Sequence, residues 1–268
     1  MHASEPMSLA CANRHSFDLS KDGYVNFLNQ PVHMQYGKEM FASRRIISGC
    51  GFYDPLIHRI SEIIGGAFKK DNTVRILDAG CGEGSHTAIL SENLVAQYHD
   101  VLTAGIDISK EAIKMAAKKN RNMVWCVADL TNIPFMDKKF DVVLNILSPS
   151  NYGEFERIMA DGGLLIKVIP GNGYLAQLRE LFYTGTGKET YSNEKVANHF
   201  KESFHLSRTE EIRYTAALSK ENLRHLIKMT PLSWGVSDEA AAKAAQAGAA
   251  GITVDLTLLI GKKPEKSC

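Results

Sequence analysis

The sequence lacks any apolar run approaching the roughly 20 residues that a membrane-spanning helix needs. It also lacks the cationic and then apolar N-terminal pattern of a secretory signal. Its five cysteines (Cys11, Cys50, Cys81, Cys126 and Cys268) are scattered and odd in number, which argues against a disulfide framework and suits reduced thiols. These absences predict a cytoplasmic protein with no membrane partner.

The sequence also lacks an excess of either positive or negative charge. The 31 Lys and Arg residues balance 30 Asp and Glu residues, for a formal net charge of +1. This balance neither favours nor excludes a nucleic-acid substrate, because a local basic patch is enough to bind one. A chain of 268 residues without internal repeats is long enough for one large domain and a small appendage.

A glycine-rich segment, Ile76-Leu-Asp-Ala-Gly-Cys-Gly-Glu-Gly84, is what the rest of the chain is organised around. An apolar strand ends in Asp78, glycines alternate, and Ser85 opens a helix. Glycine permits sharp turns and close approach of a ligand to the backbone, and a helix N-terminus offers free N–H groups. The D-x-G-x-G-x-G spacing differs from the dinucleotide fingerprint G-x-G-x-x-G. It resembles the first motif of the Rossmann-like methyltransferases that bind S-adenosyl-L-methionine; a βα turn without a ligand is the alternative.

Acidic residues follow the next two predicted strands. Asp107 comes just after the strand 101–106, and Asp129 follows the strand 123–127. In this architecture the first acid would hydrogen-bond ribose hydroxyls and the second would lie near the adenine. Each alone is about as typical of a helix N-cap. Their succession at neighbouring strand ends favours a cofactor site.

The remaining pattern predicts an α/β protein with the Rossmann-like class I S-adenosylmethionine-dependent methyltransferase fold. Further strands are expected at 140–147, 164–169 (after a turn at Gly162-Gly163), 209–217 and 252–260. Helices are expected at 40–47, 56–68, 85–94, 110–119, 220–229 and 240–250, with a helix and a polar loop in 176–200. We expect a small N-terminal module at 1–35 and the methyltransferase domain at 36–268.

The segments flanking the glycine motif carry a more specific resemblance. The run R-H-x-F-D-x-x-K-x-G-Y-V-N-x-L begins at Arg14. Two shorter motifs come later in the chain, Gly51-Phe-Tyr-Asp-Pro-Leu56 and Pro170-Gly171. A fourth, Met229-Thr-Pro-Leu-Ser-Trp234, lies near the C-terminus. The chain is thus similar to the RlmA/TlrB family, which methylates N1 of a guanine in a 23S rRNA hairpin loop.

The resemblance implies a cofactor, a partner and a set of site residues. The cofactor would be S-adenosyl-L-methionine, with S-adenosylhomocysteine as product, the partner a 23S rRNA hairpin, and the assembly a homodimer. The implied cofactor-binding residues are Tyr53 (against the methionine part), Asp78, Gly80, Gly82, Glu83, Gly84, Asp107, Asp129 and Tyr174. Tyr174 stands where relatives often carry a histidine. Tyr53 and Trp234, which would pack on the cofactor and on a base, are also typical of buried core aromatics.

The N-terminal module departs from the family pattern. Family members usually bind zinc through C-P-x-C followed by C-x-x-x-H, whereas this chain has only Cys11 and His15 of the four ligands. We therefore expect no tightly held zinc. Either the lineage has lost the site, or the start codon was placed inside the reading frame.

The sequence says less about the residues that would bind the substrate. Ser148-Pro149 retains one proline of the polar-Pro-Pro-aromatic signature of amino-methyltransferases, which favours a ring nitrogen over an exocyclic amine. Lys38, Arg44 and Arg45 are candidates for RNA phosphate contacts or for a solvated helix face. Asp18 or Asp129 could be proposed as the base that removes the guanine proton, but the pattern identifies neither.

Two other classes of function share these motifs. A small-molecule methyltransferase of secondary metabolism would keep the cofactor site and dispense with the zinc ligands. A non-catalytic module that senses the cofactor is the second. Retention of the two flanking signatures disfavours the first, and the intact glycines and acids disfavour the second.

Overall fold

The computed structural model describes residues 2–3, 8–10, 13–28, 30, 37–69, 71–98, 100–184, 191–247 and 251–263. Within them eight strands form one sheet in the order β10-β11-β9-β8-β5-β6-β7-β4, and β1, β2 and β3 form a separate small sheet. The strands are β1 (His2–Ala3), β2 (Ser8–Ala10), β3 (Ser16–Asp18), β4 (Tyr24–Asn26), β5 (Thr73–Ala79), β6 (Asp100–Asp107), β7 (Val124–Val127), β8 (Phe140–Ile146), β9 (Met159–Pro170), β10 (His205–Ala216) and β11 (Ile252–Lys262).

The order of the strands fixes where a ligand can bind. Strand β5 has a parallel neighbour on each side, β6 and β8, and the chain builds outward through β6 and β7 before it returns to β8 and β9. Such a reversal leaves a crevice at the carboxyl ends of the two central strands, which is where open α/β sheets bind ligands. Strand β11 is antiparallel to both β9 and β10, and β10 forms the edge of the sheet on that side.

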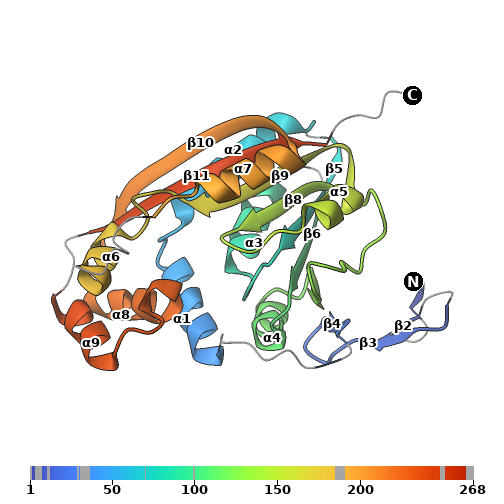
Figure 1. Ribbon diagram of the computed structural model, residues 1–268. Coiled ribbons are helices and arrows are strands. Elements are labelled where there is room, and N and C mark those ends of the chain that lie inside the picture. The colour runs from blue at the N-terminus through green and yellow to red at the C-terminus, as the bar shows by residue number, and fades with distance from the viewer. Residues whose placement is uncertain are drawn as a thin grey trace.

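Helices cover both faces of the large sheet (Figure 1). They are α1 (Lys38–Gly49), α2 (Asp54–Ala67), α3 (Ser85–Val95), α4 (Lys110–Lys119), α5 (Tyr152–Ile158), α6 (Ala176–Tyr183), α7 (Glu194–Ser203), α8 (Lys220–Met229) and α9 (Asp238–Ala247), with a 3-10 turn at Pro231–Ser233. The described residues contain no helix that is both long and apolar enough to cross a bilayer.

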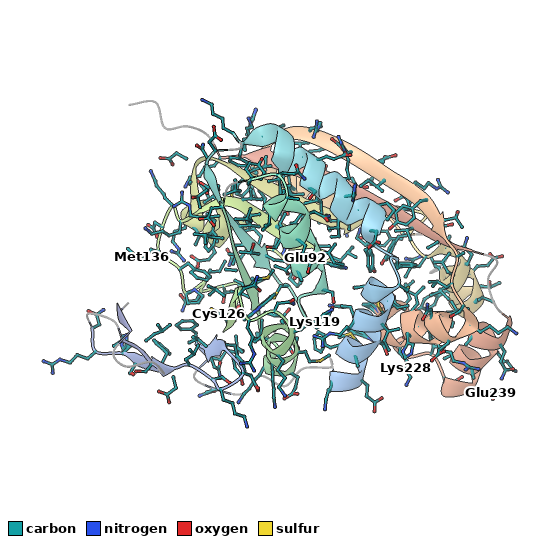
Figure 2. The ribbon with its side chains drawn as sticks, turned by 180° about the vertical axis from the view of Figure 1, so that it is seen from behind. Glu92, Lys119, Cys126, Met136, Lys228 and Glu239 are labelled. Atoms are coloured by element: carbon teal, nitrogen blue, oxygen red, sulfur yellow. The ribbon has the colours of Figure 1, made fainter. Side chains whose placement is uncertain are left out.

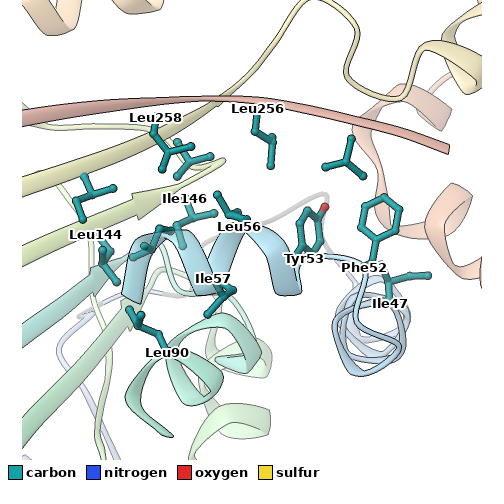
Figure 3. Close-up of a cluster of buried hydrophobic side chains, with 14 of the residues drawn as sticks. Ile47, Phe52, Tyr53, Leu56, Ile57, Leu90, Leu144, Ile146, Leu256 and Leu258 are labelled. Carbon is teal, nitrogen blue, oxygen red and sulfur yellow. The ribbon is translucent and has the colours of Figure 1, made fainter. Parts of the chain in front are cut away.

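The main core lies between the sheet and helices α2 and α3. Leu56 and Ile57 of α2 and Leu90 of α3 are buried against Leu144 of β8 and Leu256 of β11 (Figure 3). Alternate strand residues such as Val143 instead face a second cluster that contains the aromatic side chains of α5 and α7. The period-2 alternation therefore produces a three-layer α/β/α arrangement.

A group of helices stands at one end of the sheet. Helix α1 packs on α8, and α8 packs on α9, beside α6. Seen from behind, Lys119 of α4 lies between the N-terminal strands on one side and the group carrying Lys228 and Glu239 on the other (Figure 2).

The N-terminal segment contributes a strand to the large sheet. Tyr24, Val25 and Asn26 of β4 pair in parallel with Trp125, Cys126 and Val127 of β7. Tyr24 and Val25 are buried, and Tyr24 packs with Trp125 and helix α4. Residues 24–26 thus extend the sheet beyond β7.

The α/β architecture predicted from the sequence is confirmed, with local differences. The expected turn at Gly162-Gly163 lies inside β9, where Gly162 has φ 73° and the pairing register with β8 shifts. Helix α7 lies where part of the polar loop was expected. The sequence did not predict this helix, because its apolar face contains only Val196 and Phe200. Strand β10 begins at His205, four residues before the expected start. Many of the side chains of this strand are exposed.

Candidate cofactor and substrate site

The glycine motif forms the turn between β5 and α3, and Gly80 is its most constrained residue. Gly80 has φ 85°, and its N–H donates to the carbonyl of Ile106 at 2.8 Å. A Cβ at this position would lie 1.9 Å from Ser148 Oγ. Both the backbone angle and the approach of the loop after β8 therefore require glycine.

Gly84 leaves room for a neighbouring side chain. It is the N-cap of α3 with φ 79°, and a Cβ there would lie 2.6 Å from the Trp125 ring. Gly105 on β6 faces the same ring, where a Cβ would lie 2.4 Å from it. These two glycines make room for the buried indole of Trp125, whose Nε1 donates to the carbonyl of Asn120 at 2.7 Å.

Asp107 holds the glycine turn against the start of α4. One carboxylate oxygen accepts the N–H of Gly82 at 2.9 Å, and the other accepts the N–H of Ser109 at 2.8 Å. Burial raises the pKa of Asp107, and the backbone donors oppose that rise. Asp129, beyond the end of β7, accepts the N–H of Thr131 at 2.8 Å.

Asp78, the first acid of the motif, has an oxygen without a hydrogen-bond partner among the described residues. Its Oδ2 accepts the hydroxyl of Thr87 at 2.6 Å, whereas its buried Oδ1 has no hydrogen-bond partner among the described residues. Burial raises the pKa of Asp78 to about 7, and the nearby charge of Asp107 adds to the rise. A buried acceptor without a donor is costly, so the site is built for a donor, and a cationic donor would stabilise the ionised form.

Two tyrosines and a histidine form an aromatic group beside the glycine motif. The hydroxyls of Tyr53 and Tyr174 lie 2.8 Å apart, and the ring of Tyr53 meets the His86 imidazole edge-on at 4.8 Å between centroids. Burial lowers the pKa of His86 to about 4, helped by the positive charge of Arg44, so the imidazole is neutral at pH 7. Its Nε2 is buried with no partner among the described residues.

Helix α1 is tied to the glycine motif by arginine. Arg45 Nε contacts the buried carboxylate of Glu83 at 3.1 Å, and an Arg45 amine donates to the carbonyl of Met115 at 2.8 Å. Arg44 packs over the Phe41 ring at 5.7 Å and faces the site. Arg45 therefore has a positioning role inside the protein, and Arg44 lies at the cavity rather than on a solvated face.

These residues surround a cavity of about 820 Å³ at the carboxyl ends of β5, β6, β8 and β9. The predicted residues that line it are Tyr53, Asp78, Gly80, Glu83, Asp107, Asp129 and Tyr174. Gly82 and Gly84 do not line it; they shape the turn. Asp18 in β3 and Trp234 after the 3-10 turn are also absent from its lining.

The zinc question concerns the first residues of the chain. Cys11 lies outside the described residues, while His15 is described and exposed. Within the described ranges no three His, Cys, Asp or Glu side chains are grouped closely enough to hold a metal ion.

Sequence reasoning missed several lining residues. Asn145 and Lys167 lie side by side on β8 and β9, and His199 lies on α7. Lys167 had a visible signal, because a lysine in the middle of an otherwise apolar strand is unusual. His86 directly follows the glycine motif and Ser85, yet no spacing rule singles it out. His199 depended on a helix that the sequence did not reveal.

The cavity fits the methyl donor in size and in chemistry. Its volume of about 820 Å³ lies in the upper part of the range of small-molecule sites. Acceptors gather near the glycine motif, where Asp78 Oδ1 has no donor, and carboxylates stand at the ends of β6 and β7. A ligand with an ammonium group and a diol would match this set.

Comparison with known proteins assigns the family. A sequence model described as a methyltransferase domain matches residues 70–226, and one described as the RlmA N-terminal region matches residues 3–38. YxjB of Bacillus subtilis (strain 168), provisionally named a 23S rRNA (guanine-N(1)-)-methyltransferase, is 43% identical over 98% of this chain and 94% of its own. The chain belongs to the RlmA/TlrB family.

A second relative extends this result, and a solved structure is similar at low identity. The 23S rRNA (guanine(748)-N(1))-methyltransferase of Streptomyces fradiae is 30% identical over 96% of this chain and 91% of its own length. Among solved structures, the MccD protein aligns with a TM-score of 0.48 and 20% identity, over 75% of this chain and 93% of that one. The match of this RlmA/TlrB member to its relatives therefore includes the flanking segments as well as the glycine motif.

Proposed function

We propose that this protein transfers the methyl group of S-adenosyl-L-methionine to N1 of a guanine in a hairpin loop of 23S rRNA. The observation that carries the proposal is the 43% identity across nearly the whole chain to a relative named for this reaction. The 820 Å³ cavity supports it, because it has room for a cofactor and for a base beside it.

The cofactor would occupy the half of the cavity next to the glycine motif. When bound it supplies a methyl group on a sulfonium sulfur, which a nucleophile displaces in line. Asp107 would bind the ribose hydroxyls, Asp129 would lie near the adenine, and Asp78 Oδ1 would accept from the ammonium group. Tyr53, Glu83 and Tyr174 would enclose the methionine part, and Gly80, Gly82 and Gly84 keep the turn free of side chains.

The target base must reach this cavity. N1 of a paired guanine is hidden in the duplex, so a loop base or an extruded base is needed. Beside the glycine motif the cavity is lined by the loop 147–151, whose Ser148 meets Gly80, by Lys195 and His199 of α7, and by Pro231. We assign the acceptor base to the part of the cavity that this loop, α7 and Pro231 line. Positioning and exclusion of water would then be the main contributions of the protein.

Four further properties go with this proposal. We expect residues 1–35 to recognise the RNA and residues 36–268 to carry the chemistry, in a homodimer that works in the cytoplasm, where ribosomal RNA is found. We expect no tightly held zinc, since Cys11 and His15 supply two of the four ligands a closed site uses. Elemental analysis that finds one zinc per chain would overturn the zinc expectation.

The deciding experiment is methyl transfer to RNA. Purified protein, radiolabelled S-adenosyl-L-methionine and unmodified 23S rRNA are incubated, and the labelled nucleoside is identified. We expect 1-methylguanosine, and we expect the variant Asp107→Ala to lose it. Binding of the cofactor without any label in RNA would overturn the proposal and favour a small-molecule acceptor.

A further inference from the structure

Two buried lysines of the large sheet differ in the hydrogen-bond and ion-pair partners of their ammonium groups. Lys263, at the end of β11, is 6% exposed and donates to the carbonyls of Glu156 at 2.7 Å and Met159 at 2.8 Å. The carboxylate of Asp161 lies 3.8 Å from the same ammonium. Lys263 therefore has three partners, one of them a counter-charge, as a buried cation requires.

Lys167 on β9 is 3% exposed and has fewer partners. Its ammonium donates to Asn145 Oδ1 at 2.5 Å and to the carbonyl of Ser148, and no carboxylate lies within ion-pair distance among the described residues. An ammonium group has three hydrogens to donate. The described structure accounts for two, and Lys167 lines the cavity.

The surroundings of Lys167 connect it to the glycine motif. Asn145, its neighbour across the strands, donates from Nδ2 to the carbonyl of Ala79 at 2.6 Å and to that of Pro149 at 2.9 Å. The hydroxyl of Ser148 lies against Gly80. The ammonium is thus fixed in the cavity wall on β9, with β8 between it and the strand β5 that leads into the glycine turn.

We propose that Lys167 binds the carbonyl oxygen of the acceptor base, donating its third hydrogen to O6 of the target guanine. This rests on the function proposed above. O6 is adjacent to N1, and negative charge spreads onto O6 when N1 loses its proton. Transfer forms the carbon–nitrogen bond, leaves the pair of the broken carbon–sulfur bond on sulfur, and releases the N1 proton to solvent.

The proposal also gives a basis for choosing guanine over adenine. Adenine presents an amino group where guanine presents O6, and an amino group cannot accept from an ammonium. A buried donor that meets a second donor is left unsatisfied, which is the arrangement that discriminates most strongly. Burial lowers the pKa of Lys167 to about 8, so the donor form still predominates at pH 7.

The test combines a protein change with a change in the base. Lys167→Met and wild type are assayed by kcat/KM on an RNA hairpin that carries either guanine or 6-thioguanine at the target. Sulfur accepts hydrogen bonds weakly. We expect the loss caused by Lys167→Met to be about tenfold larger on guanine than on 6-thioguanine, which corresponds to about 1.4 kcal/mol of coupling.

Lys263→Met is the matched control, because it removes a buried lysine of the same sheet that does not line the cavity. Its effect on kcat/KM should be the same for both bases, and a merely structural role for Lys167 predicts the same pattern for Lys167→Met. Equal losses on both bases, or no loss at all, would overturn the inference while the proposed function stands. A wild type that makes no 1-methylguanosine overturns both.

Discussion

The hydroxyl groups of Tyr53 and Tyr174 share a buried hydrogen bond of 2.8 Å between positions 121 residues apart in the chain. Tyr53 is the N-cap residue of α2, and Tyr174 lies in the turn between β9 and α6. Both rings line the cavity, and burial raises the pKa of both phenols, so neither is ionised near neutral pH. The bond therefore fixes two walls of the site relative to each other.

Removing one partner of this bond should be costly. Tyr174→Phe leaves the Tyr53 hydroxyl buried without its partner, which costs about 1–3 kcal/mol of the free energy of unfolding. Urea denaturation followed by circular dichroism measures the difference.

The double variant Tyr53→Phe with Tyr174→Phe is the informative comparison. Because it removes both polar groups, its loss should be smaller than the sum of the two single losses. Strictly additive losses would show that the hydroxyls do not interact.

Gly80→Ala should weaken cofactor binding. The added Cβ would lie 1.9 Å from Ser148 Oγ at a backbone angle of φ 85°, so the turn and the loop after β8 must both shift. We expect the Kd for S-adenosyl-L-methionine to rise at least about tenfold, or about 1.4 kcal/mol, by calorimetry.

Gly66→Ala is the control for that substitution. Gly66 lies in α2, where a Cβ would meet no atom within 4 Å. Alanine in place of glycine inside a helix stabilises by about 1 kcal/mol, and cofactor affinity should not change. Tight binding by Gly80→Ala would contradict the placement of the cofactor.

Asp78 should give the stability a characteristic pH dependence. Its pKa is about 7 in the folded protein against an ordinary value of 3.8 for an aspartate, so the folded state binds the proton more tightly. The free energy of unfolding should therefore fall as pH rises from about 4 to about 7, at most by about 1.4 kcal/mol per pH unit from this group.

Asp78→Asn tests this directly, since the amide oxygen can still accept from Thr87 but does not titrate. The unfolding free energy of the variant relative to wild type should increase between pH 5 and pH 7. Parallel profiles of unfolding free energy against pH for the two proteins would refute the raised pKa of Asp78.

His86 should stay neutral across the physiological range. Its pKa of about 4 lies below the ordinary 6.5, so its contribution to stability is complete above about pH 6.5 and is lost as pH falls toward 4. In a proton NMR titration, the resonance missing from the His86→Gln spectrum should stay constant from about pH 5.5 to 8. A midpoint near 6.5 would mean that the imidazole is solvated.

The central sheet could be predicted because parallel buried strands read as continuous apolar runs. Val143 and Leu165 lie on such strands, and the acids Asp78 and Asp107 mark the ends of theirs. The role of Gly84 could not be predicted, because it depends on the Trp125 ring, which comes from a strand 40 residues later. Spacing alone indicates a glycine-rich turn; it does not say whether a ligand or a side chain fills the space.

Several residues that line the rest of the cavity could not be predicted from the sequence. Lys167, Asn145 and His199 come together only through strand pairing and a helix with few apolar residues. Arg45 looked like a candidate for phosphate binding, whereas its partner Glu83 lies 38 residues away. Pairs at such separations leave no periodic signal.

Strand β4 has a consequence for the order in which the protein assembles during synthesis. Of the strands in the large sheet it is the first to leave the ribosome, yet its partner is residues 124–127 of β7. Tyr24 and Val25 must therefore wait, with their apolar surface uncovered, until about a hundred more residues have been made. The edge strand that appears first in translation thus stays unpaired until β7 has been made, and a chaperone has an opportunity to bind it in that interval.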